Sequence, residues 1–112
     1  MTIYHLANRD DWAAAQATGR YHGSPDDHRD GFIHFSTAAQ VARSAATYRA
    51  GRHDLVLLGV DADVLGAALR WEPSGSGDLY PHLYGPLPTR AVHRTDPLPL
   101  GQGGGHVFPA LD

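Results

Sequence analysis

Three histidines stand in apolar segments of the chain, where an ionisable ring is unusual. His5 lies in Ile-Tyr-His-Leu, His34 in Gly-Phe-Ile-His-Phe-Ser-Thr, and His82 in Pro-His-Leu-Tyr-Gly-Pro-Leu. A buried imidazole needs hydrogen-bond partners, and an imidazole in a pocket can act as a general acid or base or bind a metal. For any one ring, a core histidine bonded to the main chain is equally consistent with the sequence. Three such rings together favour a single shared cleft.

Four further residues near these segments could take part in chemistry. Ser36 and Thr37 follow His34 and can cap a helix, whose free N–H groups could also bind an anion. Tyr84 could stack on a planar ligand, or be a core aromatic with a solvated hydroxyl. Glu72 is the only glutamate and lies between a tryptophan and a proline. Partial desolvation there would raise its pKa and suit it to acid–base work, whereas an exposed carboxylate at a strand end would have no such role.

The composition indicates one globular domain spanning residues 1–112, with 42% hydrophobic and 19% charged residues. No apolar run approaches the ~20 residues that span a bilayer, and no signal peptide is present, so we expect a cytoplasmic protein without a membrane partner. Cysteine is absent, which excludes disulfides and thiolate metal sites. All basic residues are arginine, which excludes a lysine nucleophile. A net charge of −3 argues against a nucleic-acid partner.

Two helices are expected to position these residues. The first spans about 9–18, with Asn8 as its cap and Gly19 as its stop. The second begins at about residue 38, where Thr37 and Gln40 have capping-box spacing, and ends at Gly51. Its expected buried face comprises Ala38, Val41, Ala42, Ala45 and Tyr48.

The remaining apolar runs predict strands joined by polar loops. We expect 23–30 to be a polar loop, 61–66 a single turn, 80–88 an irregular apolar segment and 95–112 an irregular tail. The loop 73–78 has the composition of a lid beside a cleft. The predicted fold is α+β, with two main helices on a small, bent or split mixed sheet. The expected strands span about 3–7, 32–36, 55–60, 68–72 and 90–94.

The order of these segments over residues 3–94 resembles a bacterial family called domain of unknown function 952. That family is similar in fold to the ADP-ribosyltransferases, which include poly(ADP-ribose) polymerases and RNA 2′-phosphotransferases. The resemblance implies that His5 hydrogen-bonds a ribose of NAD and that His34 lines the nicotinamide side. It also implies that Ser36 and Thr37 match a Ser-Thr-Ser element. The matching segments are Ile3–Leu6, Trp12, Gly19, Tyr21, Gly31–Thr37, Asp54–Leu58, Trp71–Glu72 and Pro81–Leu87.

One part of the family pattern is missing. Transferases of the glutamate type carry their catalytic glutamate near a late strand, and the segment 90–94 offers none. Either Glu72 reaches the cleft from a different place, or His82 and Tyr84 replace that glutamate. The missing glutamate counts against transfer chemistry more than against nucleotide binding.

Three hypotheses follow. The first is binding of NAD or an ADP-ribose-type nucleotide, with ADP-ribosyl or phosphate transfer and with NAD as substrate. The second is a non-catalytic interaction domain, and the third is a metal site made by three histidines, with Glu72 as base or fourth ligand. The sequence gives no indication of oligomeric state. In the first hypothesis the catalytic residues are His34, Glu72 and His82, no metal is assigned, and the ligand-binding residues are His5, Ser36, Thr37 and Tyr84.

Overall fold

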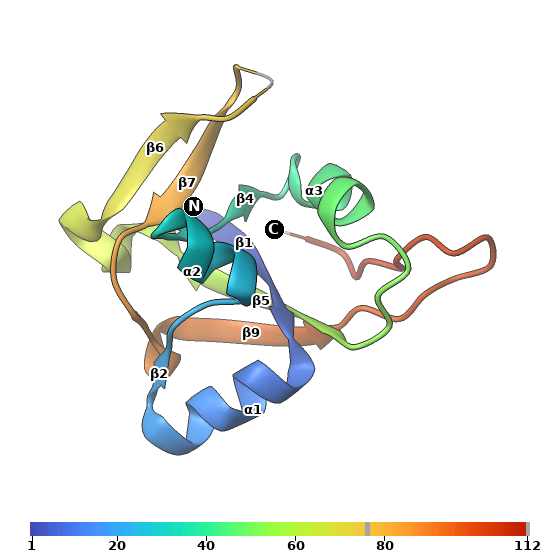
Figure 1. Cartoon of the computed structure of the whole chain (residues 1–112), viewed down its shortest axis with the longest axis horizontal. Helices are drawn as coiled ribbons and strands as arrows, with labels where there is room; N and C mark the ends of the chain where they lie inside the picture. The colour runs from blue at the N-terminus through green and yellow to red at the C-terminus, as the bar shows by residue number, and fades with distance from the viewer. Residues whose placement is uncertain (76, 112) are drawn as a thin grey trace.

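The structure is a computed structural model that describes residues 1–75 and 77–111. Ser76, in the expected 73–78 loop, and Asp112, at the end of the tail, lie outside the described residues. The fold is α+β, as expected (Figure 1). Its elements are β1 (Thr2–Asn8), α1 (Arg9–Thr18), β2 (Arg20–Tyr21), α2 (Pro25–Asp30), β3 (Ile33–His34), β4 (Ser36–Thr37), α3 (Val41–Tyr48), β5 (Leu55–Asp61), the 3₁₀ helix η1 (Ala62–Ala68), β6 (Leu69–Pro73), β7 (Leu79–Leu83), β8 (Leu87–Pro88), the 3₁₀ helix η2 (Thr89–Ala91) and β9 (Val92–Pro97).

The strands form separate small sheets. Four strands pair in the order β4-β1-β5-β9, three in the order β3-β7-β6, and β2 pairs with β8. The hairpin of β6 and β7 extends away from the four-stranded sheet (Figure 1). The expected split sheet is therefore confirmed. Every strand pair among the described residues is antiparallel, so the expectation of a mixed sheet was wrong.

β1 lies in the middle of the molecule and contributes to two cores because its side chains alternate between opposite faces. Ile3 and Ala7 belong to the first core, and Tyr4 and Leu6 to the second. His5 lies between Ile3 and Ala7 in this alternation. The first core also holds Trp12, Tyr21, Ile33, Phe35, Leu58 and Leu87, and the second also holds Val41, Ala45, Leu55, Leu57 and Leu98.

The first helix has the predicted bounds. α1 covers Arg9–Thr18 and follows Asn8 directly. Gly19 closes it with φ 84°, a left-handed conformation that glycine adopts without strain, and its N–H donates to the Ala15 carbonyl at 2.8 Å. Trp12 and Ala15 form the buried side.

The expected strand at 32–36 is two short strands that belong to different sheets. β3 pairs with β7, and β4 pairs with β1. Phe35 lies between them, and its N–H donates to the Pro81 carbonyl at 2.9 Å. This segment therefore links the three-stranded sheet to the four-stranded sheet.

The segment 23–30, expected to be a loop, contains α2. The Ser24 side chain accepts from the Asp27 N–H while the Asp27 side chain accepts from the Ser24 N–H, which is a complete capping box. Pro25 occupies the first turn, where its missing N–H costs nothing. These local contacts make a six-residue helix from residues that read as turn formers.

α3 is shorter than expected. It begins at Val41 rather than at residue 38 and ends at Tyr48, before Gly51. Half of the expected capping box forms, since the Thr37 N–H donates to the Gln40 side-chain oxygen at 3.0 Å. Val41 and Ala45 are buried as expected, whereas Ala42 is exposed and Tyr48 is 72% exposed.

The second half of the chain is more regular than expected. β5 begins where predicted and ends one residue later, the expected turn at 61–66 is η1, and the strand at 68–72 is β6, shifted by one residue. The strand expected at 90–94 is β9, which ends at Pro97. No helix among the described residues is long and apolar enough to cross a membrane.

The segment 80–88 contains two strands, β7 and β8, despite its prolines. β3 pairs only with His82 and Leu83, so one side of β7 has no strand partner at Pro81. Beyond β9 the tail is irregular apart from a bridge between Leu100 and His106. It still contributes to the second core, through Leu98, Phe108 and Leu111.

Candidate functional site

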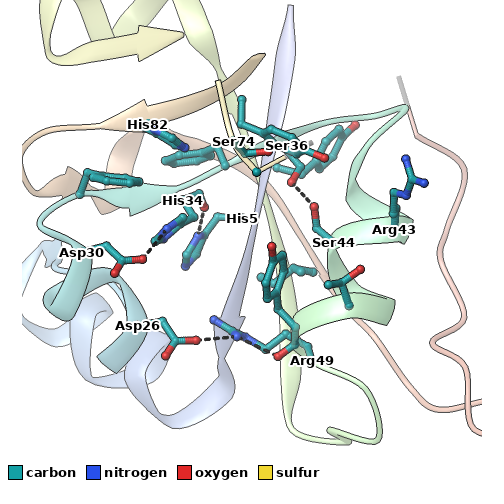
Figure 2. Close-up of a pocket in the computed structure, with 18 of the residues that line it drawn as sticks. His5, Asp26, Asp30, His34, Ser36, Arg43, Ser44, Arg49, Ser74 and His82 are labelled. Atoms are coloured by element: carbon teal, nitrogen blue, oxygen red, sulfur yellow. Dashed lines mark hydrogen bonds and ion pairs between the residues drawn. The ribbon is translucent and has the colours of Figure 1, made fainter. Parts of the chain in front are cut away.

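A pocket of about 570 Å³ lies between α2, α3 and the three-stranded sheet (Figure 2). His5, His34 and His82, from three distant segments, all line it. Ser36 and Tyr80 also line it, so the sequence-predicted histidine segments share one cavity. Of the other sequence-predicted site residues, Thr37, Glu72 and Tyr84 do not line this pocket.

His5 is almost fully buried and both of its ring nitrogens are engaged. Nδ1 donates to the His34 main-chain carbonyl at 2.6 Å, because a carbonyl oxygen can only accept. Nε2 therefore accepts from the Tyr21 hydroxyl at 2.7 Å. Burial lowers the pKa of His5, so the ring is neutral at pH 7. A bond from His5 to a ligand would require one of these two bonds to break.

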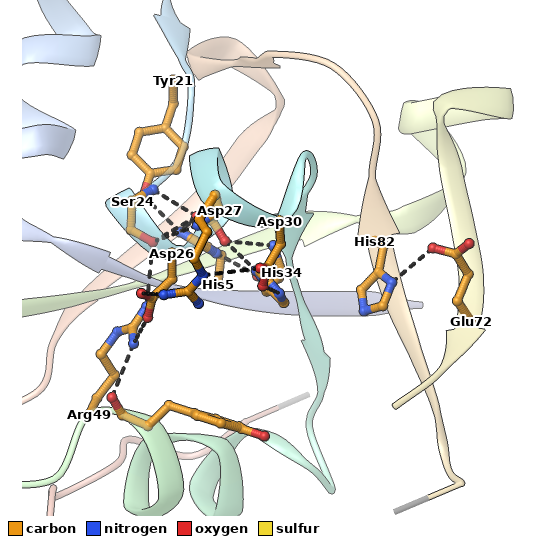
Figure 3. A network of polar contacts seen from close by, with 12 residues as sticks. His5, Tyr21, Ser24, Asp26, Asp27, Asp30, His34, Arg49, Glu72 and His82 are labelled. Atoms are coloured by element: carbon orange, nitrogen blue, oxygen red, sulfur yellow. Dashed lines mark hydrogen bonds and ion pairs between the residues drawn. The ribbon is translucent and has the colours of Figure 1, made fainter. Parts of the chain in front are cut away.

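Asp27 forms a buried anionic centre next to His5 (Figure 3). Its carboxylate accepts from the N–H and the hydroxyl of Ser24 at 2.7 and 3.0 Å, and from the N–H of His34 at 3.0 Å. Burial opposes ionisation of Asp27, but the His34 hydrogen bond and the other donors outweigh it and hold the pKa well below its usual range. The same burial and negative charge raise the pKa of Tyr21.

His34 lies between two carboxylates. Its Nδ1 faces Asp27 Oδ1, and its Nε2 lies 3.0 Å from Asp30 Oδ2. A neutral imidazole can donate from only one nitrogen, so only the protonated ring donates to both acids. The ring is about 40% exposed and lies at the pocket wall.

His82 is held by Glu72 through one nitrogen and leaves the other free. Nδ1 lies 2.9 Å from Glu72 Oε1, and this oxygen also accepts from the Tyr84 hydroxyl at 2.7 Å. Within residues 1–75 and 77–111, Nε2 of His82 makes no hydrogen bond. A carboxylate on Nδ1 favours the tautomer in which Nε2 carries a lone pair, the form that can accept a proton.

Of the two interpretations of Glu72, the desolvated carboxylate with a raised pKa was wrong. The hydrogen bonds that Glu72 accepts from Tyr84 and then from His82 lower its pKa instead, because they stabilise the carboxylate. The same contact raises the pKa of Tyr84. Glu72 and Tyr84 therefore act on the pocket through His82 and do not border it themselves.

Phe32 fixes the plane of the His82 ring. The two rings stack with centroids 4.0 Å apart and an interplanar angle of 28°. Phe32 also contacts the rings of His34 and Tyr84, with centroids 4.6 and 5.3 Å away. The aromatic contacts and the Glu72 hydrogen bond together restrict how His82 can turn.

Ser36 and Thr37, the two hydroxyl residues after His34, have different roles. Ser36 lines the pocket and its Oγ lies 2.8 Å from Ser44 Oγ on α3. Thr37 pairs with Ile3 in the four-stranded sheet, and its N–H donates to the Gln40 side chain. Ser36 is thus available to a ligand in this geometry, whereas Thr37 has a structural role.

The loop expected to act as a lid does border the cavity. Pro73, Ser74 and Gly75 line the pocket on the side of the β6–β7 hairpin. In Figure 2, Ser74 and His82 both lie at the upper edge of the cavity.

Several residues of the site were not found from the sequence. The sequence pattern places Asp27 in a loop and includes Tyr21 only in the family resemblance, and no local pattern marks Phe32 or Arg43 as site residues. The spacing of Ser24 and Asp27 is the one local signal, since a serine followed three residues later by an acid marks a helix start. The partners of Tyr21 and Phe32 are distant in sequence, so no local pattern marks them.

The three-histidine metal site does not form. Among the described residues, no group of three histidine, aspartate or glutamate side chains is placed to hold a metal ion. His5 shows why, since its two nitrogens are taken by a carbonyl and a hydroxyl.

Comparison with known proteins places the chain in a family. The crystal structure of protein CC0527 from Caulobacter crescentus is 43% identical, with a TM-score of 0.92, and covers 96% of this chain and 94% of its own. The solution NMR structure of CC0527 is 44% identical, with a TM-score of 0.84, and covers 93% and 90%. None of the curated proteins is significantly similar to the chain. Residues 6–95 match the model of the family described as protein of unknown function (DUF952), and the chain belongs to that family.

Proposed function

We propose that the pocket binds a nucleotide of the NAD or ADP-ribose class and that His82 acts there as a general base in ADP-ribosyl or phosphate transfer. One observation carries the proposal. His82 lines the pocket with Nδ1 held by Glu72 and with Nε2 unengaged within the described residues. This pairing of a carboxylate with one imidazole nitrogen is how proteins orient a histidine to take a proton at the other.

The shape and lining of the pocket suit such a ligand. Its volume of about 570 Å³ lies within the roughly 300–1,000 Å³ typical of small-molecule sites. Aromatic side chains of Phe32 and Tyr80 line the pocket and offer faces for a nicotinamide or purine ring. The resemblance to ADP-ribosyltransferases that the sequence motifs imply would suit the same ligand class.

In the proposed ADP-ribosyl transfer, the bond between the nicotinamide nitrogen and the ribose C1′ breaks, and its electron pair goes to the nicotinamide. A bond forms between the acceptor oxygen and C1′, and the acceptor proton moves to Nε2 of His82. Glu72 stabilises the imidazolium that results, with Tyr84 holding Glu72 in place. His34 lines the pocket beside His82, with its ring nitrogens held by Asp27 and Asp30, and His5 donates to its main-chain carbonyl.

An NMR titration tests the binding step. Addition of NAD or ADP-ribose is expected to shift the ring signals of His82 and His34 and to leave those of His53, an exposed histidine outside the pocket, unchanged. Absence of any shift at His82 and His34 would overturn the proposal.

Release of nicotinamide tests the transfer step. His82→Gln is expected to lower the rate by at least about 100-fold while retaining NAD binding, because it removes the proton acceptor alone. His53→Gln is the matched control and should leave the rate unchanged. Binding of NAD by the wild type without nicotinamide release would reject transfer from NAD and keep the binding.

A further inference from the structure

The charges around the pocket are balanced except at one arginine. Arg29 pairs with Asp26 at 3.1 Å and with Asp30 at 3.2 Å. Arg49 pairs with the other oxygen of Asp26 at 3.0 Å. The two carboxylates at the α2 side of the cavity are therefore already paired with cations, and Figure 2 shows the Asp26–Arg49 pair.

Arg43 is the exception. It lines the pocket from α3, and in the part of the chain that the structure describes it makes no ion pair or hydrogen bond through its side chain. A guanidinium carries five N–H donors and its charge persists at every physiological pH. Its position leaves an uncompensated positive charge on the α3 side of the cavity.

Two hydroxyl groups lie on the same side of the pocket as Arg43. Ser44 is the next residue on α3, and its Oγ is 2.8 Å from Oγ of Ser36. One of these hydroxyls donates to the other, so the second proton of the pair is left for an acceptor outside it. Ser36 is only 6% exposed, which makes a donated bond there valuable to a ligand.

We propose that Arg43 and the Ser36–Ser44 hydroxyl pair form an anion subsite that takes a phosphoryl group of the bound nucleotide. The inference rests on the proposed function and names the residues that would hold the phosphoryl groups of its nucleotide. A guanidinium fork with a neighbouring hydroxyl matches the oxygens of a phosphoryl group. The sugar then lies between this subsite and His82, which lines the same pocket.

Calorimetric titration with adenosine and AMP tests the subsite. At low salt the wild type is expected to bind AMP at least about tenfold more tightly than adenosine, with the difference shrinking as salt rises. Arg43→Gln should reduce AMP affinity to that of adenosine and leave adenosine affinity unchanged. Arg90→Gln, on the exposed η2 and outside the pocket, is the matched control and should retain the preference.

Inorganic diphosphate separates this inference from the proposed function. Its addition should shift the Nε–H signal of Arg43, which is assigned by its loss in Arg43→Gln. If diphosphate shifts that signal while adenosine, AMP and NAD bind nowhere, the anion subsite stands and the proposed function fails. If adenosine and AMP bind equally and Arg43→Gln changes neither affinity, the subsite is overturned and nucleotide binding stands.

Discussion

Asp27 and His34 are joined twice through a single oxygen. Oδ1 of Asp27 accepts from the His34 main-chain N–H at 3.0 Å and also faces the ring Nδ1 of the same residue. The other oxygen binds Ser24. One buried carboxylate thus fixes the start of α2, the backbone of β3 and a histidine of the pocket.

Asp27→Asn is therefore expected to destabilise the fold. The amide keeps one acceptor oxygen and turns an NH₂ group toward groups that donate, so we expect a loss of about 2–4 kcal/mol in the free energy of unfolding. Urea unfolding followed by circular dichroism measures it. Asp63→Asn, on the exposed face of η1, should stay within about 0.5 kcal/mol of the wild type. An unchanged midpoint for Asp27→Asn would contradict this role.

Tyr21→Phe tests the other side of the same network. The variant keeps the ring but removes the hydroxyl that donates to Nε2 of His5. A buried acceptor without a donor costs about 1–3 kcal/mol, and thermal unfolding should show that loss. Tyr48→Phe, at a tyrosine that is 72% exposed, is the control and should leave the melting temperature unchanged. Equal melting temperatures for the two variants would show that the hydroxyl of Tyr21 is dispensable.

Stability should fall as the pH falls. The folded state lowers the pKa of His5, so the unfolded chain binds this proton more readily. The neutral ring stabilises the fold fully above the unfolded pKa of about 6.5, and that contribution is lost as the pH drops below it. Asp27, whose folded pKa is also depressed, adds a second loss below about pH 4. Urea midpoints at pH 7.5, 6.0 and 5.0 should decrease in that order, and a rise would refute the account.

The carboxyl group of Glu72 should titrate at unusually low pH. It is the only glutamate, so its side-chain carboxyl signal is identified directly in a carbon NMR spectrum. Its pKa should lie below the reference of about 4.3, because Tyr84 and His82 donate to the ionised form. Tyr84→Phe should move the pKa back up, and Tyr48→Phe should not. A wild-type pKa at or above the reference value would be incompatible with the Tyr84–Glu72–His82 contacts.

The sequence predicted the parts of the fold that depend on neighbouring residues. α1 has its expected bounds, and Gly19 closes its end as predicted, whereas Asn8 forms no side-chain cap bond and instead donates to the Asp11 side chain. β5 was found from its unbroken apolar run, which fits a strand covered on both faces. The break at Phe35 was missed because the partners of β3 and β4 come from β7 and β1, far away in the chain.

The sequence predicted the histidines that line the pocket but not the residues that surround them. Apolar neighbours singled out His5, His34 and His82, which do line one pocket. The residues flanking Glu72 are consistent with either a desolvated or an exposed carboxylate. They do not predict the lowered pKa, because the controlling contact comes from Tyr84, 12 residues later. Such partners are set by strand pairing, which a local pattern does not contain.

The residues that the family model matches are fewer than the residues that a stable fold of this chain needs. The family match covers residues 6–95, yet His5 precedes that range and Leu98 and Phe108 follow it. A fragment trimmed to the matched range would leave the Tyr21 hydroxyl without its acceptor and strip apolar cover from the second core. Gene fusions, affinity tags and recombination points therefore belong outside both strand β1 and the tail that carries Phe108.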